Sequence, residues 1–104
     1  MEKTDFTITS QTETDGVKLK AVGYIVYNTA TQFEKALNDA LSSNPKSLTI
    51  DMDKVVVFTS IAIRVILKAY KTAQEKGIKF QIENPSDIVR NVLKLSKLEE
   101  MLVV

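Results

Sequence analysis

The feature that most constrains the fold is the alternation of strand-like and helix-like segments along the chain. Four short segments are rich in β-branched and aromatic residues, and three longer segments repeat apolar residues at helical spacing. Strands are expected at 6–10, 17–27, 47–52 and 78–82, and helices at 31–43, at 60–76 and after Ser86. Parallel strands need crossover connections. The order β-β-α-β-α-β-α therefore predicts an α/β fold in which amphipathic helices pack on a mixed β-sheet that opens with a hairpin.

Local signals predict where the helices begin and end. Asn28, Thr29 and Thr31 can all cap the first helix, and Glu34 stands three residues beyond Thr31 in the spacing of a capping box. Gly77 is expected to stop the second helix, and Ser86 is expected to cap the third. Two apolar segments are expected outside the regular elements: a connector at 55–58 and a short tail at 98–104.

Length and charge narrow the class of protein. The 104 residues suit a single domain with one hydrophobic core. The 14 basic and 13 acidic side chains nearly cancel, so charge favours neither nucleic acid nor an anionic membrane as a partner. The N-terminus is acidic and does not resemble a signal peptide, and no segment approaches the roughly 18 apolar residues of a transmembrane helix. We therefore expect a cytoplasmic protein that does not insert into a membrane.

The chain contains neither cysteine nor histidine, which removes much catalytic chemistry. Disulfides, thiolate nucleophiles and the usual zinc ligand sets are excluded, and the side chain best suited to proton transfer near neutral pH is missing. Asp51 and Asp53 could bind a metal ion or act as a carboxylate acid–base pair. The second role would make the chain a carboxylate-dependent enzyme. A polar strand end that stops an apolar run explains them more simply. We expect no enzymatic activity, no metal and no cofactor.

Two groups of helical side chains leave a binding role open. The lysines that could form a basic patch are Lys68, Lys71, Lys76 and Lys94. Solvated lysine faces are common, so we expect no nucleic-acid partner. The apolar residues at helix-like spacing near the C-terminus are Leu95, Leu98, Met101 and Leu102. This stripe is either a partner-binding face or, as is more common, the last part of the core.

The second helix is expected to start with two hydroxyl residues, Thr59 and Ser60, directly after the apolar residues 55–58. A hydroxyl at this place can cap free backbone N–H groups, which is a purely structural role. The same place favours a phosphoryl group, because the helix dipole stabilises negative charge there. The residues alone leave both roles open.

This region resembles the STAS domains, a family named for sulfate transporters and bacterial anti-sigma factor antagonists. The resemblance is strongest over 48–55 and 58–67. The family has there an apolar strand ending in Asp, a short connector, the sequence Asp-Ser-Ser/Thr-Gly-Leu and an apolar helix. Gly23, Gly77 and the ending 92–98, which is similar to the family's Leu-Thr-Gly-Leu, support it. The resemblance covers nearly the whole chain and implies a single STAS-like domain over 1–104.

The resemblance also implies a function and a set of site residues. Thr59 stands where the family has Asp, Ser60 matches the first serine, and Ile61 occupies the phosphoacceptor position. What this implies is a non-catalytic module similar to an anti-sigma factor antagonist. Such a module binds an anti-sigma factor or a serine kinase-like regulatory protein around the start of the second helix. The usual phosphoserine switch is missing here, and Ser60 is left as a candidate phosphorylation site. The partner-binding residues expected from the resemblance are Asp51, Thr59, Ser60, Ile61 and Arg64. The alternative is a non-catalytic subunit of a membrane transport complex.

Overall fold

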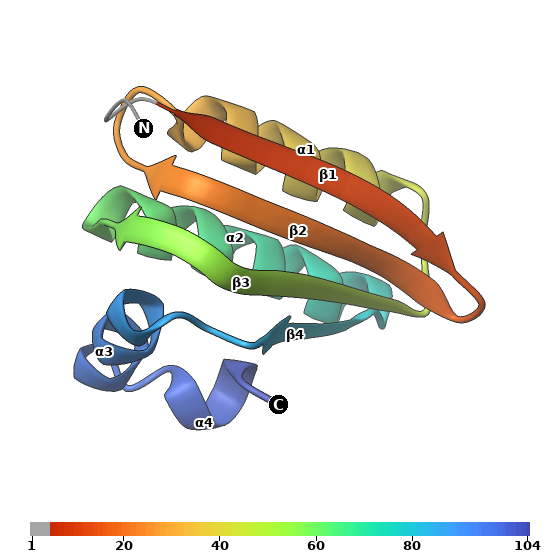
Figure 1. The fold of residues 1–104 in the computed structure, drawn as a ribbon. Helices are drawn as coiled ribbons and strands as arrows, with labels where there is room; N and C mark the ends of the chain where they lie inside the picture. Colours follow the sequence, from red (N-terminus) through yellow and green to blue (C-terminus); the bar gives the residue numbers. More distant parts are fainter. Residues whose placement is uncertain (1–4) are drawn as a thin grey trace.

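The computed structural model describes residues 5–104, which form one mixed sheet and four helices (Figure 1). The elements are β1 (Phe6–Glu13), β2 (Gly16–Ile25), α1 (Ala30–Ser42), β3 (Ser47–Phe58), α2 (Ser60–Lys76), β4 (Lys79–Glu83), α3 (Asp87–Leu95) and α4 (Glu99–Leu102). The strand order is β1-β2-β3-β4. β1 pairs antiparallel with β2, and β3 pairs parallel with both β2 and β4. The predicted α/β fold, with its mixed sheet and opening hairpin, is confirmed.

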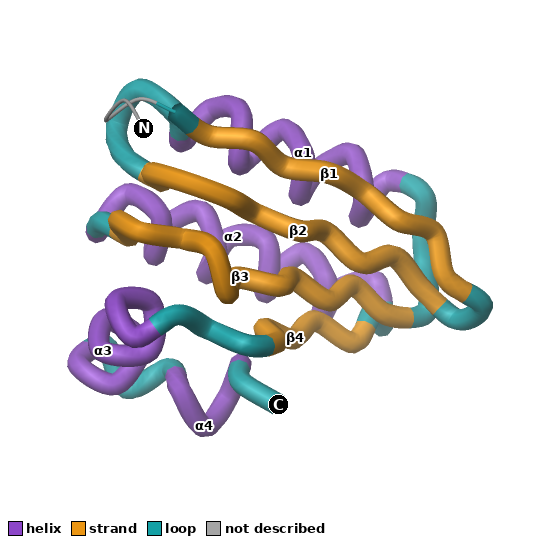
Figure 2. Tube along the Cα trace, in the orientation of Figure 1, coloured by secondary structure: helices purple, strands orange, loops and turns teal. Residues whose placement is uncertain are grey.

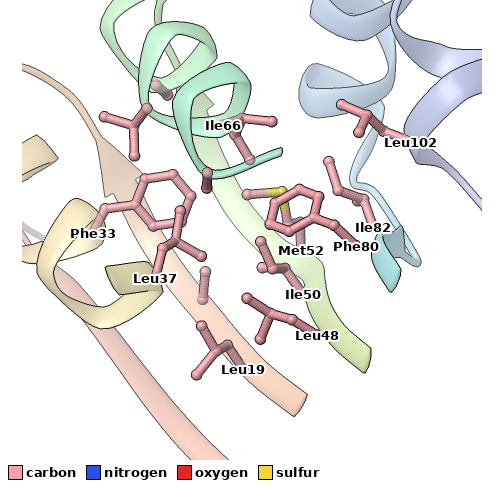
Figure 3. Close-up of a cluster of buried hydrophobic side chains, with 14 of the residues drawn as sticks. Leu19, Phe33, Leu37, Leu48, Ile50, Met52, Ile66, Phe80, Ile82 and Leu102 are labelled. Atoms are coloured by element: carbon pink, nitrogen blue, oxygen red, sulfur yellow. The ribbon is translucent and has the colours of Figure 1, made fainter. Parts of the chain in front are cut away.

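The hydrophobic core lies between the sheet and the helices. α1 and α2 cover one face of the sheet, and α3 and α4 lie beside β4 and the end of β3 (Figure 1). Figure 3 labels the buried side chains Leu19, Phe33, Leu37, Leu48, Ile50, Met52, Ile66, Phe80, Ile82 and Leu102. Because side chains alternate between the two faces of a strand, the polar residues gather on the opposite face. One cross-strand row on that face consists of Thr9, Lys20, Asp51 and Glu83.

β3 is longer than predicted, because residues 55–58 continue the strand instead of forming a connector. The strand bends in its middle (Figure 2), close to a shift of its register with β2 between Lys20 and Val22. Asp53 and Lys54 are exposed at this bend. Asp51 and Asp53 therefore both lie within the strand, and the prediction that the strand ends at Met52 is wrong.

Ser86 binds the second half of β3, which has no β4 beside it. The pairing of β4 with β3 stops at Asp51. Beyond this point the N–H of Ser86 donates to the Met52 carbonyl at 3.1 Å, and its hydroxyl donates to the Val55 carbonyl at 2.7 Å. The same hydroxyl accepts the N–H of Val89 at 3.4 Å, so the predicted cap of α3 is confirmed. One side chain thus starts a helix and holds the edge of a strand.

The two ends of the described chain also differ from the prediction. β1 continues to Glu13, because each residue from Phe6 onward pairs with a residue of β2. The predicted tail contains the short helix α4, and Val103 forms a parallel bridge with Ile82.

The C-terminal apolar stripe divides into a buried and an exposed part. Leu102 is buried and Leu98 packs against the core. Leu95 is exposed by 85% and Met101 by 43%. Only the first pair therefore belongs to the core.

Two more predicted helix signals can be compared with the structure: the stop at Gly77 and the capping box of the first helix. Gly77 ends α2 in the left-handed region with φ of 70°, as predicted. Of the three candidates for the first helix, Thr29 is the N-cap residue, because α1 begins at Ala30. Thr31 lies inside the first turn, so the predicted capping box does not form.

Candidate functional site

α1 and α2 begin side by side at the carboxyl ends of the parallel strands β2 and β3 (Figure 1). Each strand leads into its helix through a short connection: residues 26–29 join β2 to α1, and Thr59 alone joins β3 to α2. In open α/β sheets, binding sites commonly lie just outside the carboxyl ends of the strands. The two helix starts therefore define the place where a site is expected.

Thr29 fixes the start of α1. Its side chain is buried, with 5% of the residue exposed, and its hydroxyl donates to the Tyr24 carbonyl at 2.6 Å. The same oxygen accepts the N–H of Val26 at 2.9 Å. These bonds satisfy polar groups of the turn, because a buried polar group without a partner is costly. Thr29 is the N-cap residue of α1, but its hydroxyl makes no capping bond to the helix.

Thr59 fixes the start of α2 in a similar way. Its hydroxyl donates to the Ile25 carbonyl at 3.1 Å, and its N–H donates to the same carbonyl at 3.3 Å. The hydroxyl therefore does not cap α2, and no side-chain cap is present at this helix. Thr29 and Thr59 bind the carbonyls of consecutive residues, Tyr24 and Ile25, at the end of β2. This shared attachment sets the two helix starts next to each other.

A groove of about 730 Å³ runs between the two helix starts. We call it the α1–α2 groove, and its lining residues are Tyr27, Asn28, Ala30, Thr31, Glu34, Ile61, Arg64, Val65 and Lys68. Ile61 is half-buried, and it belongs neither to the core nor to the half-buried apolar residues that pack against the core. Tyr27 is 78% exposed at the rim. The groove thus combines apolar surface with polar residues at its edge.

The charged residues of the groove are Glu34, Arg64 and Lys68. Lys68 Nζ lies 3.3 Å from Glu34 Oε2, so these two charges pair across the helices. Within residues 5–104, the exposed guanidinium of Arg64 has no ion-pair partner. The first turns of α1 and α2 contain no acidic residue. The groove therefore carries an uncompensated positive charge.

Ser60 and Thr59 differ in the availability of their hydroxyls. Ser60 is exposed, and its hydroxyl has no hydrogen bond to any residue of the described chain. Thr59 is half-buried and its hydroxyl is engaged with β2. Of the two, Ser60 is the hydroxyl that a modifying enzyme can reach.

The structure brings four of the five expected site residues together and sets Asp51 apart. Thr59, Ser60, Ile61 and Arg64 all lie at the start of α2. Asp51 lies on the polar face of the sheet, and β3 continues to Phe58 before α2 begins. At about 3.3 Å per residue, this separation is on the order of 20 Å.

The environment of Asp51 is that of a structural carboxylate. Its Oδ1 accepts the N–H of Asp53 at 3.0 Å next to the bend of β3. In the described chain no group of three or more acidic side chains is arranged to hold a metal ion. None of the helices in residues 5–104 is long and apolar enough to cross a membrane.

Sequence reasoning missed Tyr27, Asn28 and Glu34, which α1 and its connection contribute to the groove. It also did not place Lys68 of α2 there. Tyr27 and Asn28 lie in the short connection that follows β2. The rule that sites form at the carboxyl ends of parallel strands is a signal that could have found them.

Comparison with known proteins supports the family suggested by the sequence. Several solved structures share the fold at low sequence identity. An anti-sigma factor antagonist from Mycobacterium paratuberculosis is 19% identical, with a TM-score of 0.85 over 95% of this chain and 85% of that chain. The anti-sigma factor antagonist SpoIIAA in its unphosphorylated form is 16% identical, with a TM-score of 0.79 over 94% of this chain and 86% of that chain. The STAS domain of an anti-sigma factor antagonist from Rhodobacter sphaeroides is 17% identical, with a TM-score of 0.64 over 85% of this chain and 99% of that chain.

A comparison with curated protein sequences found no match. The family model of the STAS domain matches residues 7–104, which is nearly the whole chain. The order of strands and helices agrees with this match. The chain therefore belongs to the STAS domain family.

Proposed function

We propose that this chain is a non-catalytic binding module of the anti-sigma factor antagonist type. Its partner is an anti-sigma factor or a serine kinase-like regulatory protein, which it binds through the α1–α2 groove and the start of α2. One observation carries the proposal: Ile61 lines an open groove at the helix start instead of filling the core. Apolar and aromatic side chains such as Ile61 and Tyr27, surrounded by polar residues, are typical of protein interfaces.

Three structures similar to this chain are those of anti-sigma factor antagonists, which supports the choice of partner class. At 16–19% identity they show the fold alone, so the partner has to be tested directly. The test is calorimetric titration of the purified chain with purified anti-sigma factors or serine kinases encoded next to its gene. We expect saturable binding to one of them. Capture of a transport protein, with no binding to any such regulator, would contradict the proposal and favour the transport-complex alternative.

Regulation at the start of α2 forms the second part of the proposal. Position 61 has no hydroxyl, so a phosphoryl group with its charge of about −2 cannot be added there. We propose that this surface stays permanently in the uncharged, binding-competent state. Ser60 is the one neighbouring hydroxyl that is exposed and free of hydrogen bonds within the described residues.

A kinase assay tests this part. The chain is incubated with a serine kinase encoded next to its gene and with ATP, and its peptides are then analysed by mass spectrometry. We expect no stoichiometric phosphate on the peptide that contains Ser60. Full phosphorylation of Ser60, removed by Ser60→Ala, would show that the switch has moved by one residue.

A further inference from the structure

We propose that the α1–α2 groove receives an acidic segment of the partner protein, in which an apolar side chain contacts Ile61 and a carboxylate binds Arg64. This inference rests on the proposed function, because it describes the part of the partner that enters the groove. It specifies the chemistry of that segment, which the family of the chain does not.

The charge of the groove is the first argument. Glu34 and Lys68 neutralise each other at 3.3 Å, which leaves Arg64 as the one lining charge without a partner in residues 5–104. A guanidinium binds a carboxylate with two parallel hydrogen bonds, which makes a carboxylate its best protein partner. Arg64 is exposed and is not held by another side chain of the described chain, so it is free to reorient toward such a group.

The helix starts add to this positive potential. Neither α1 nor α2 has an acidic residue in its first turn, and neither has a side-chain cap. The hydroxyls of Thr29 and Thr59 are used on the carbonyls of β2 instead. Each helix start therefore keeps its partial positive charge, and both lie at the same end of the groove. A basic segment would therefore be repelled by Arg64 and by the starts of both helices.

The apolar surface and shape of the groove are the second argument. The half-buried Ile61 lines it together with the mostly buried Val65 and Ala30, and Tyr27 stands at the rim with 78% of its surface exposed. A small, fully polar anion would leave this apolar surface in water, whereas a peptide side chain would bury it. The volume of about 730 Å³ accommodates a few side chains of a partner segment.

Nuclear magnetic resonance with designed peptides tests the inference. The probes are three dodecapeptides of the same leucine pattern, in which the other positions are glutamate, glutamine or lysine. The ¹⁵N-labelled chain is titrated with each, and amide shifts are followed at Tyr27, Ile61 and Arg64. We expect the glutamate peptide to bind there at least tenfold more tightly than the glutamine peptide. Equal binding of all three peptides, or shifts confined to another surface, would overturn the inference.

Charge reversal supplies the matched control. Arg64→Glu should abolish the preference for the glutamate peptide and create a preference for the lysine peptide. Lys71→Glu changes an exposed cation of α2 outside the groove and should leave the affinities for the glutamate and lysine peptides unchanged. Both side chains are exposed, so the melting temperatures should match that of the wild type. Light scattering detects a second copy as occupant: a dimer that Arg64→Glu dissociates would overturn the assignment to a partner protein.

The same variants on the regulatory partner separate this inference from the proposed function. If the anti-sigma factor or kinase binds and Arg64→Glu weakens that binding at least tenfold while Lys71→Glu does not, both stand. If the regulator binds equally well to Arg64→Glu, the inference fails and the proposed function stands. If no regulator binds but the glutamate peptide still depends on Arg64, the proposed function fails and the chemistry of the groove stands.

Discussion

Replacement of Thr29 by valine tests whether the buried hydroxyl at the end of β2 holds the start of α1. Valine has nearly the same shape, so the change removes two hydrogen bonds without opening a cavity. The lost bonds are the donation to the Tyr24 carbonyl at 2.6 Å and the acceptance from the Val26 N–H at 2.9 Å. A buried group left without its partner costs about 1–3 kcal/mol, and the added methyl group offsets part of this. We expect the free energy of unfolding to fall by about 2 kcal/mol.

Urea titration followed by circular dichroism measures this change, and thermal unfolding should show a fall of about 10 °C. Thr29→Ser keeps the hydroxyl and should recover part of the loss. Thr31 is an exposed threonine in the first turn of α1, so Thr31→Val should change the free energy of unfolding by less than about 0.5 kcal/mol. If Thr29→Val were as stable as Thr31→Val, the hydroxyl would not hold this turn and our account of the helix starts would be wrong.

Two further predictions concern the stability of the fold. Lys97 has a φ of 60° after α3, in the same left-handed conformation that Gly77 has after α2. Glycine adopts this conformation without the steric cost of a side chain, so Lys97→Gly should raise the free energy of unfolding by about 0.5–1 kcal/mol. Gly77→Ala should lower it by about 1 kcal/mol. A loss of stability in Lys97→Gly during urea titration would contradict this. The Glu83 carboxylate lies 2.5 Å from Lys18 Nζ, and its hydrogen bond raises the pKa of Lys18 above the ordinary value of a lysine. The contribution of this pair to stability is therefore complete below the unfolded-state pKa and is lost as the pH rises through the higher folded-state pKa. Thermal unfolding at about pH 11 should therefore show a smaller alkaline loss for Lys18→Met than for the wild type or for Lys20→Met, and an equal loss in all three would refute it.

The order of elements could be predicted because the periods of strands and helices are local properties of the sequence. The length of β3 could not, because the exposed pair Asp53 and Lys54 interrupts the apolar run and resembles a loop. In the structure this pair lies at the bend of the strand, and the edge beside it is held by Ser86. That contact joins residues 31 positions apart, and no local pattern contains it.

The candidate site could be predicted only for the half that lies on one helix. Ser60, Ile61 and Arg64 are close in sequence, and their pattern pointed to the start of α2. Tyr27 and Glu34 reach the groove from α1 and its connection, which tertiary packing brings alongside. The hydroxyl of Thr59 also escaped prediction, since the preference of threonine for helix starts does not reveal which carbonyl its hydroxyl will bind.

The most direct test of the central claim is the affinity of Ile61→Glu for the regulatory partner, measured by calorimetric titration beside thermal unfolding. Ile61 lines the groove and lies outside the core, so a carboxylate there should remove apolar contact and add a desolvation cost. We predict that Ile61→Glu weakens binding at least tenfold, which corresponds to about 1.4 kcal/mol, with little change in melting temperature. Leu67→Glu, at an apolar residue of α2 that is 40% exposed and lies outside the groove, should bind like the wild type. A stable Ile61→Glu variant with unchanged affinity would contradict the account, and so would a large fall in its melting temperature, which would make Ile61 a core residue.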